Sequence, residues 1–294
     1  MDYSRRGFTG LMLAMFLGPR HGNSSSPDSR SLLKGYRADA VILLLGIPIF
    51  ELSGVGSGQV AVEETGEGAQ ARRTLFFAAG SDPKRAHGLA RLGWMREVTH
   101  APETMPAETE YFGVLTSSPE ESLDSARKSV TAPPKGRSVF AAVNGRHTAG
   151  RSRSALAQFE FSSDAPWSDR GLIEKAQSAF APTTVWRETS WPKLPDQPPP
   201  TFLFQLEALL KQRAKCNGMY VYNEQEYLLE LGVPQQGRPP DRLLAIKGAV
   251  RNQRTGNRTA FRVWLENAPS SVVPVRIEFQ PRSFLRLTFE ALPS

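Results

Sequence analysis

DRLLAIKGAVRNQRTGNRTAFRVWLENAPSSVVPVRIEFQPRSFLRLTFEA, residues 241–291, decides the fold class of this 294-residue chain. Within this segment, apolar and polar side chains alternate over residues 244–250, 261–266, 275–279 and 285–291. Successive side chains of a β-strand point to opposite faces of its sheet, so the alternation predicts four consecutive antiparallel strands. One face of this meander is expected to be buried and the other solvated.

The remaining sequence also favours strands over helices. Because strands follow strands instead of alternating with helices, we expect a mainly β fold with a few α-helices. About a dozen strands are too many for a flat sheet, so residues 27–294 should form a single domain built on a curled antiparallel sheet or half-open barrel. Runs rich in Val, Ile, Leu, Phe and Tyr predict the further strands at 36–47, 59–63, 73–78, 89–98, 109–116, 138–143, 154–161 and 219–231.

About three helices are expected to pack against the sheet. Ser118 and Glu121 form a capping box that predicts the start of the first helix. A second helix is predicted after Ser168 and a third over residues 202–210, because apolar residues recur there at helical spacing. Residues 192–200 contain five prolines, and we interpret them as an extended surface linker between the two halves of the sheet.

Two segments near the N-terminal end of the expected domain are unusual. Residues 41–47, Val-Ile-Leu-Leu-Leu-Gly-Ile, predict a strand that is buried on both faces or bent onto the core. The run is too short to cross a bilayer, which takes roughly 20 apolar residues. Residues 54–58, Gly-Val-Gly-Ser-Gly, predict a turn or a β-bulge rather than a phosphate-binding loop.

Residues 1–26 resemble an export signal. Arg5 and Arg6, followed by Phe8 and a short apolar run, are similar to the twin-arginine signal. An ordinary Sec signal, whose arginines simply form its positive n-region, is the alternative. Either route places the protein in the periplasm or elsewhere in the cell envelope, with no transmembrane span after the signal is removed.

The net charge and the cysteine content limit the classes of partner and of covalent cross-link that we expect. The net charge of +7 remains positive when residues 1–26 are removed, which favours association with anionic surfaces. Outside the cytoplasm such surfaces are lipid headgroups or acidic polysaccharide, and not nucleic acid. Cys216 is the single cysteine, so an intramolecular disulfide is excluded, and the sequence leaves the oligomeric state open.

The sequence contains no motif of a known reaction. His21, His87, His100 and His147 show no paired spacing of metal ligands, so we expect no metal site. Ser-x-x-Lys occurs without its partner motifs, and acidic pairs such as Glu224 and Glu226 are interpreted as solvated. No catalytic residue and no cofactor are therefore predicted.

The polar face of the C-terminal meander carries a cluster around Trp264. Arg262 and Arg276 are expected to stack on its ring and to pair with acidic residues across strands. A platform for stacking sugars is the alternative interpretation. A basic segment at residues 146–153 is expected to be a hairpin loop, with anion binding as its alternative.

The last ninety residues resemble an exported bacterial family known as domain of unknown function 3108. The resemblance rests on Lys247-Gly248, Thr255-Gly256, the runs at 261–265 and 274–277, and the apolar helix over 203–210. It implies an exported, curled antiparallel sheet associated with the cell envelope, and it implies no catalytic residues.

Together these features favour an envelope protein that binds a lipid or another amphiphile on the inner face of its sheet. Basic residues at the rim would suit an anionic headgroup. A purely structural or interaction protein is the first alternative, and a hydrolase of envelope polysaccharide is a weaker one. The residues expected to face such a ligand are Leu244, Val263, Leu265, Ile277 and Leu287.

Overall fold

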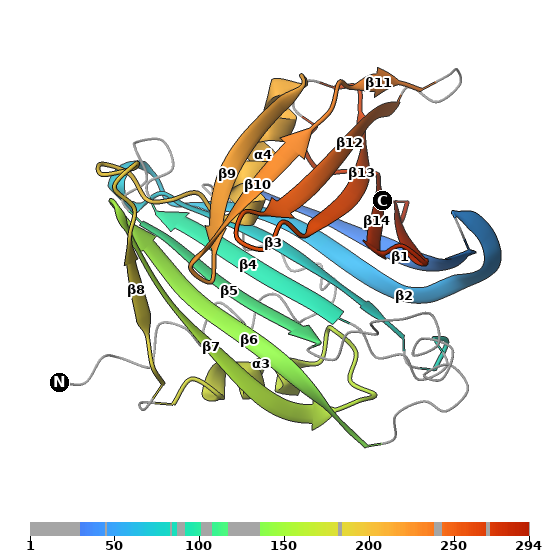
Figure 1. Ribbon diagram of the computed structural model, residues 1–294, viewed down its shortest axis with the longest axis horizontal. Coiled ribbons are helices and arrows are strands. Elements are labelled where there is room, and N and C mark those ends of the chain that lie inside the picture. Colours follow the sequence, from blue (N-terminus) through green and yellow to red (C-terminus); the bar gives the residue numbers. More distant parts are fainter. Residues whose placement is uncertain are drawn as a thin grey trace.

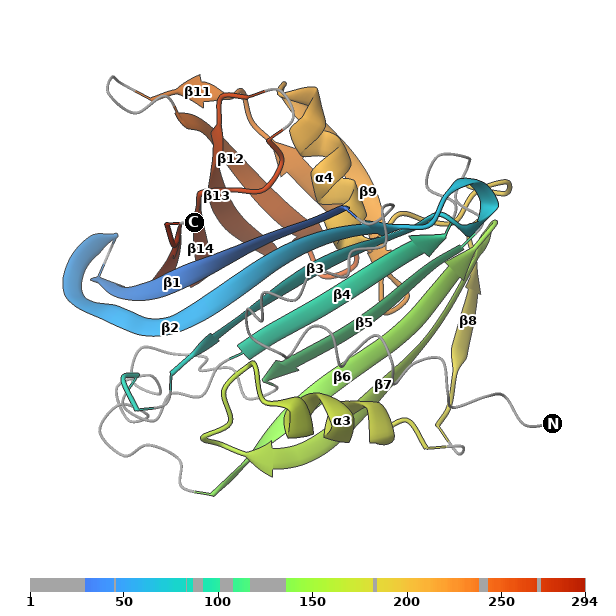
Figure 2. The same ribbon diagram turned by 180° about the vertical axis from the view of Figure 1, so that it is seen from behind.

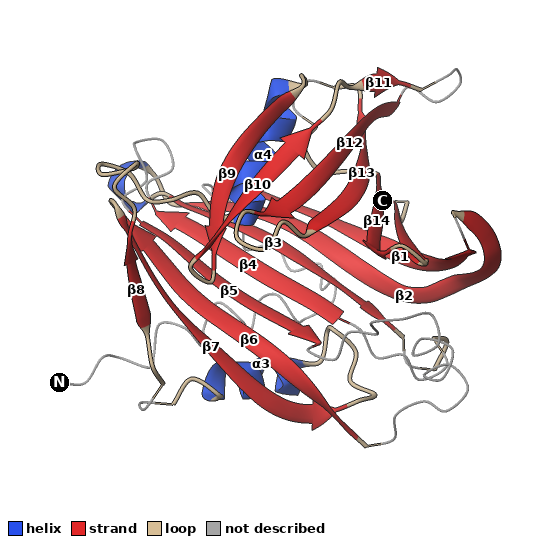
Figure 3. Cartoon of the chain, viewed as in Figure 1, coloured by secondary structure: helices blue, strands red, loops and turns tan. Residues whose placement is uncertain are grey.

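The structure, a computed structural model, confirms a mainly β fold with helices packed on a curled sheet (Figure 3). The export segment with Arg5, Arg6 and Phe8, and the first expected helix beginning at Ser118, lie outside the described residues. The described residues are 30–44, 46–82, 84–86, 92–100, 108–116, 136–181, 184–237, 243–268 and 271–293.

Strands in the N-terminal half form one meander, in which each strand pairs with the next. Its strands are β1 (Arg30–Leu44), β2 (Ile47–Thr65), β3 (Arg72–Ser81), β4 (Leu92–His100), β5 (Glu108–Thr116), β6 (Arg137–Thr148), β7 (Arg151–Ser162) and β8 (Arg187–Ser190). A short 3-10 helix, η1 (Gly68–Gln70), joins β2 to β3.

The C-terminal half forms a second meander, which includes the four strands expected within residues 241–291. Its strands are β9 (Cys216–Tyr222), β10 (Gln225–Leu231), β11 (Gln235–Gln236), β12 (Leu243–Asn252), β13 (Arg258–Glu266), β14 (Arg276–Arg282) and β15 (Leu285–Ala291).

The two meanders form one 15-stranded antiparallel sheet because the first strand pairs with the last. The register between β1 and β15 runs from Tyr36 opposite Ala291 to Ile42 opposite Leu285. The strand order is β8-β7-β6-β5-β4-β3-β2-β1-β15-β14-β13-β12-β10-β9, so β8 and β9 are the two edges (Figure 1).

The sheet curls until the edge strand β9 lies against the inner face of β5. Gly113 on β5 lies under Tyr222 of β9 so closely that a Cβ there would sit 2.5 Å from the Tyr222 hydroxyl. The rings of Tyr222 and Tyr111 are 5.4 Å apart, and the Asn223 N–H donates to the Tyr111 hydroxyl at 3.2 Å. Among the described strands no pairing joins β8 to β9, so the expected half-open barrel is confirmed.

Two α-helices cover opposite faces of the sheet within the described residues. We call the concave side, with Glu97, Tyr111 and Val263, the inner face, and the other side the outer face. Helix α4 (Phe202–Gln212) packs on the inner face through Leu209 and Leu210. Helix α3 (Arg170–Ser178) packs on the outer face of β6 and β7, where Figure 2 shows it in front of these strands.

Two local expectations need correction. The N-cap of α3 is Asp169 and not Ser168, since the Asp169 carboxylate accepts from the Gly171 and Leu172 N–H groups. The basic residues expected in a loop at 146–153 instead continue β6 and β7, because the hairpin turns at Gly150 with a positive φ of 63°. Antiparallel pairing there satisfies backbone groups that a long loop would leave to water.

The β1–β2 hairpin is longer than its neighbours. It shows the expected bulge: the register shifts between Ala38 and Ala40, opposite the glycine-rich part of β2, and Gly54 has a φ of +63°. Strand β15 pairs with β1 only as far as Ile42, and β3 pairs with β2 only from Gly56 onward. The tip of the hairpin therefore extends beyond the sheet as a two-stranded ribbon, at the right of Figure 1.

Candidate functional site

The five residues expected to face an amphiphile all lie on the inner face. Val263 and Leu265 are 2% and 0% exposed, and Leu244 and Ile277 pack against the same cluster as α4. Leu287 contacts a neighbouring cluster around Phe289. Because α4 covers this part of the face, the first four side chains form the core between helix and sheet, and an amphiphile bound there would have to displace the helix.

A buried carboxylate on β4 holds α4 in place. Glu97 is fully buried and accepts hydrogen bonds from the Leu203 N–H at 2.9 Å and the Phe204 N–H at 3.1 Å. The Thr201 hydroxyl donates to the same carboxylate at 2.5 Å instead of capping its own helix. Glu97 thus satisfies N–H groups that the first turn of any helix leaves unpaired, from a strand over a hundred residues away in sequence.

Two further contacts orient the helix. Arg73 of β3 pairs with Glu207 of α4, and Lys211 lies 3.2 Å from the same carboxylate. At the C-terminal end, Arg213 adopts the left-handed conformation with a φ of 47° and donates to the carbonyl of Ser271 at 3.1 Å. Both ends of α4 are therefore fixed by polar contacts as well as by its apolar side.

Burial shifts the pKa of the polar groups on the inner face. Desolvation raises the pKa of Glu97 to about 7, against the opposing effect of its hydrogen bonds. Desolvation lowers the pKa of His147 to about 4, so this imidazole is neutral near pH 7. Its Nδ1 is 2.7 Å from the Pro199 carbonyl and donates to it, while its Nε2 is buried without a partner. The same burial raises the pKa of Tyr111 to about 12.

The proline-rich segment contributes to this interior. Residues 192–197 are mostly exposed, as expected of a surface segment, but Pro198 and Pro199 are buried. The Pro199 carbonyl accepts from His147, and the Pro200 carbonyl accepts from the Val221 N–H at 2.9 Å. The end of the segment therefore ties the inner face of β6 to β9.

The expected cluster around Trp264 lies on the outer face. The guanidinium groups of Arg276 and Arg262 lie 4.8 and 5.4 Å from the centre of its ring. Arg276 also contacts Glu278 at 2.8 Å and Glu290 at 3.4 Å. With two guanidinium groups beside it, the Trp264 ring shows the contacts expected of cation–π stacking.

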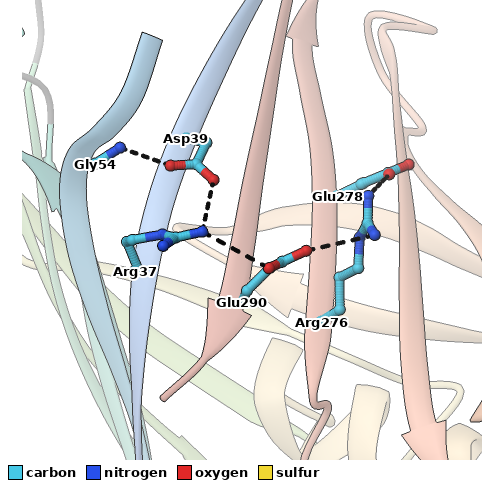
Figure 4. A network of polar contacts seen from close by, with 6 residues as sticks. All are labelled: Arg37, Asp39, Gly54, Arg276, Glu278 and Glu290. Atoms are coloured by element: carbon cyan, nitrogen blue, oxygen red, sulfur yellow. Dashed lines mark hydrogen bonds and ion pairs between the residues drawn. The ribbon is translucent and has the colours of Figure 1, made fainter. Parts of the chain in front are cut away.

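The network around Arg276 extends across β14, β15, β1 and β2 (Figure 4). Arg37 lies 3.9 Å from Glu290 and 3.5 Å from Asp39, and Asp39 accepts from the Gly54 N–H at 2.6 Å. Its side chains contact one another across the junction of the two meanders. We interpret this outer ladder as a support for the β1–β15 junction.

One group of possible metal ligands escaped the sequence analysis. His100 and Glu108 are opposite each other on β4 and β5, and Glu110 follows on the same face. Their ligand atoms lie within 4.8 Å of one another. Spacing along the chain cannot reveal such a group, because the residues meet only through strand pairing. Arg146 donates hydrogen bonds from Nε and Nη2 to the two carboxylate oxygens of Glu108 and neutralises its charge. We therefore assign no metal site.

The tip of the β1–β2 hairpin exposes large apolar side chains. The sequence predicted that residues 41–47 are buried on both faces or bent onto the core, and this is wrong for the tip. Leu44 is 49% exposed and Ile47 is 66% exposed, and Ile49 and Phe50 on the returning strand are 47% and 51% exposed. No strand pairs with the hairpin at this point among the described residues, so nothing in the sheet covers them.

No family model matches the chain, and no curated protein matches its sequence. Among solved structures, the chain is similar to a β-barrel-like protein of the domain of unknown function DUF1849 from Brucella abortus. The two share 9% sequence identity, with a TM-score of 0.43 over 89% of this chain and 96% of that one. Neither helix in the described part of the chain is long and apolar enough to span a bilayer.

Proposed function

We propose that the protein is an exported protein of the cell envelope that docks on lipid surfaces through the tip of its β1–β2 hairpin. Export is supported by the N-terminal segment with Arg5, Arg6 and Phe8. Lipid docking is supported by one observation, the four exposed apolar side chains Leu44, Ile47, Ile49 and Phe50 on a projecting ribbon. Because α4 covers the inner face, we place the lipid contact at the tip of the hairpin instead.

The net charge of the chain favours an anionic lipid surface over a second protein. Lys84 and Arg85 are exposed beside β2, and Arg286 lies opposite Val41 of β1. Glu51, Asp82 and Asp39 are acidic residues of the same region, and Arg85 lies 3.8 Å from Asp82, so the charges near the tip balance. The whole chain is basic, with a net charge of +7.

The exposed area implies weak and reversible binding. Full burial of a Leu, Ile or Phe side chain is worth about 1.5–3 kcal/mol. Because the four side chains are about half exposed, docking should gain about 1 kcal/mol from each, or about 4 kcal/mol in total. That corresponds to an affinity in the millimolar range, which basic side chains near anionic headgroups improve by about 1 kcal/mol each.

The docking test is flotation of the protein with vesicles of phosphatidylglycerol and phosphatidylethanolamine. The variant Ile47→Ser, Ile49→Ser, Phe50→Ser should lose flotation and keep its unfolding temperature, since these side chains make no core. The matched control is Leu156→Ser with Val185→Ser, which removes exposed apolar side chains elsewhere (51% and 78% exposed) and should float like the native protein.

Two results would contradict the docking proposal. Equal flotation of the tip variant and the control variant would show that the tip is not the contact. Dimerisation of the native protein that the tip variant abolishes, without binding to vesicles, would show that a second copy covers the tip.

A separate experiment tests export. Replacing Arg5 and Arg6 by Lys should retain the protein in the cytoplasm, and unimpaired export would refute the twin-arginine route.

A further inference from the structure

A pocket of about 350 Å³ lies at the seam between the end of β8 and the C-terminal meander. Trp191, the residue after β8, lines it from one edge. The opposite side belongs to two hairpin turns of the C-terminal meander, β9–β10 and β12–β13. We call this the seam pocket; its other lining residues are Glu224, Gln225, Glu226, Gln253 and Arg254.

Hydrogen bonds hold the two turns together as one wall. The Gln253 N–H donates to the Glu226 carbonyl at 3.0 Å, and the Asn252 amide donates to the Gln225 side chain at 2.7 Å. The Asn252 side-chain oxygen in turn accepts from the Arg254 N–H at 2.9 Å. The polar side chains of the wall are thus positioned before any ligand arrives, which lowers the entropic cost of binding.

Glu224 occupies a backbone conformation that its residue type disfavours. The two residues of the β9–β10 turn, Asn223 and Glu224, have φ values of 47° and 59°. Asn tolerates this left-handed region, whereas Glu costs roughly 1–2 kcal/mol there and glycine is the usual residue. The Glu224 side chain lines the pocket and accepts from the Ser154 hydroxyl at 3.0 Å across the seam.

Three buried polar atoms on β6, on β7 and just after β8 have no hydrogen-bond partner. Ser152 lies two residues from Ser154 on β7, opposite His147 on β6, and both are at most 1% exposed. The Ser152 hydroxyl, the His147 Nε2 and the Trp191 Nε1 are buried without a hydrogen-bond partner. Buried polar atoms of native proteins are almost always paired. Of these three residues, Trp191 lines the pocket.

The chemistry of the lining narrows the class of ligand. Two carboxylates and one guanidinium leave the pocket with one net negative charge, which disfavours an anion. A single aromatic ring among five polar side chains does not suit an acyl chain. Carboxylates and amides together match a ligand with several hydroxyl groups, each of which donates and accepts.

We propose that the seam pocket binds one sugar unit of a saccharide that is uncharged or carries an amino group. Its hydroxyl groups donate to the carboxylates of Glu224 and Glu226, and the bound sugar lies beside the Trp191 side chain. This site is independent of lipid docking, because the hairpin tip contributes no residue to it.

The test is a titration of the full chain, followed by the indole N–H signals in ¹H–¹⁵N correlation spectra. Glucose, glucosamine, N-acetylglucosamine and glucuronic acid are the probes, and Trp191→Phe assigns the Trp191 signal by its loss. At least one of the first three sugars should shift the Trp191 signal and leave that of Trp167, which donates to Ser57 on the outer face, unmoved. Glucuronic acid should bind about tenfold more weakly than glucose, because its charge repels the carboxylates.

Glu224→Gly separates binding from folding, because glycine accepts the left-handed turn without strain. The variant should stay folded and bind the sugar at least about tenfold more weakly, since a charge-assisted hydrogen bond is lost. Gln280→Ala, on β14, is the matched control and should bind like the native chain. The proposal is overturned if none of the sugars moves the Trp191 signal, if glucuronic acid binds most tightly, or if Glu224→Gly binds undiminished.

Discussion

Glu97→Ala removes the carboxylate that holds the first turn of α4 on the inner face. At pH 5 the carboxyl group is protonated in the folded protein, because burial raises its pKa to about 7. Its loss leaves the Thr201 hydroxyl and the Leu203 and Phe204 N–H groups without their partner in a buried place. At about 1–1.5 kcal/mol for each donor, we expect the free energy of unfolding to fall by about 3–5 kcal/mol.

The same variant should cost less at high pH. A carboxyl group with a raised folded pKa stabilises the fold fully below its usual pKa near 4.5, and that contribution is lost as pH rises through 7. Above pH 7 the native protein is destabilised by a buried charge that the variant lacks. Between pH 5 and pH 8 the destabilisation by Glu97→Ala should therefore shrink by about 2–3 kcal/mol.

Urea unfolding at the two pH values, followed by tryptophan fluorescence, measures both effects. Glu174→Ala is the matched control: this exposed glutamate of α3 pairs with Arg170 at 2.7 Å and should cost less than about 0.5 kcal/mol at either pH. A loss below about 1 kcal/mol at pH 5 would refute the role of Glu97 as the cap of α4. A loss that does not change with pH would refute the desolvation argument.

Two other predictions concern the same interior. Phe289→Ala should destabilise by about 3–5 kcal/mol, since Phe289 is 7% exposed against Tyr36 and Ala38, whereas Phe279→Ala, at 37% exposed, should cost less; thermal unfolding ranks the two. His147→Gln should reduce the change in the free energy of unfolding between pH 4 and pH 7. A depressed folded pKa of about 4 makes the native protein gain about 3 kcal/mol as pH rises from 4 to 7, and an unchanged profile would contradict this.

The fold followed from local patterns that the sequence displays directly. Alternation around Val263 and Leu265 predicted both the strand and its buried face, and the apolar stripe through Leu209 and Leu210 predicted α4. The stacking of Arg276 on Trp264 was also predictable, because alternation placed both side chains on the solvated face. These features depend on neighbours within one or two strands.

The sites could not be predicted from the sequence because they depend on contacts between residues that are far apart along the chain. Glu97 meets the start of α4, and Glu224 meets Ser154, only after the sheet has curled. A charged residue within the apolar run around Trp94 was the one available signal for Glu97. The hairpin tip was misjudged for a different reason: an apolar run near Leu44 predicts burial, and nothing in the sequence shows that neighbouring strands end before it.

Quenching by brominated lipid tests most directly whether the hairpin tip enters a membrane. Phe50→Trp places an indole at the tip, and Val185→Trp places one at an exposed control position. With vesicles that contain phosphatidylglycerol and phospholipids brominated along their acyl chains, the indole introduced at position 50 should shift its emission to shorter wavelength and be quenched. The control should show neither change. If the Phe50→Trp protein binds the vesicles and its added emission stays unquenched, the tip does not insert and the docking proposal is contradicted.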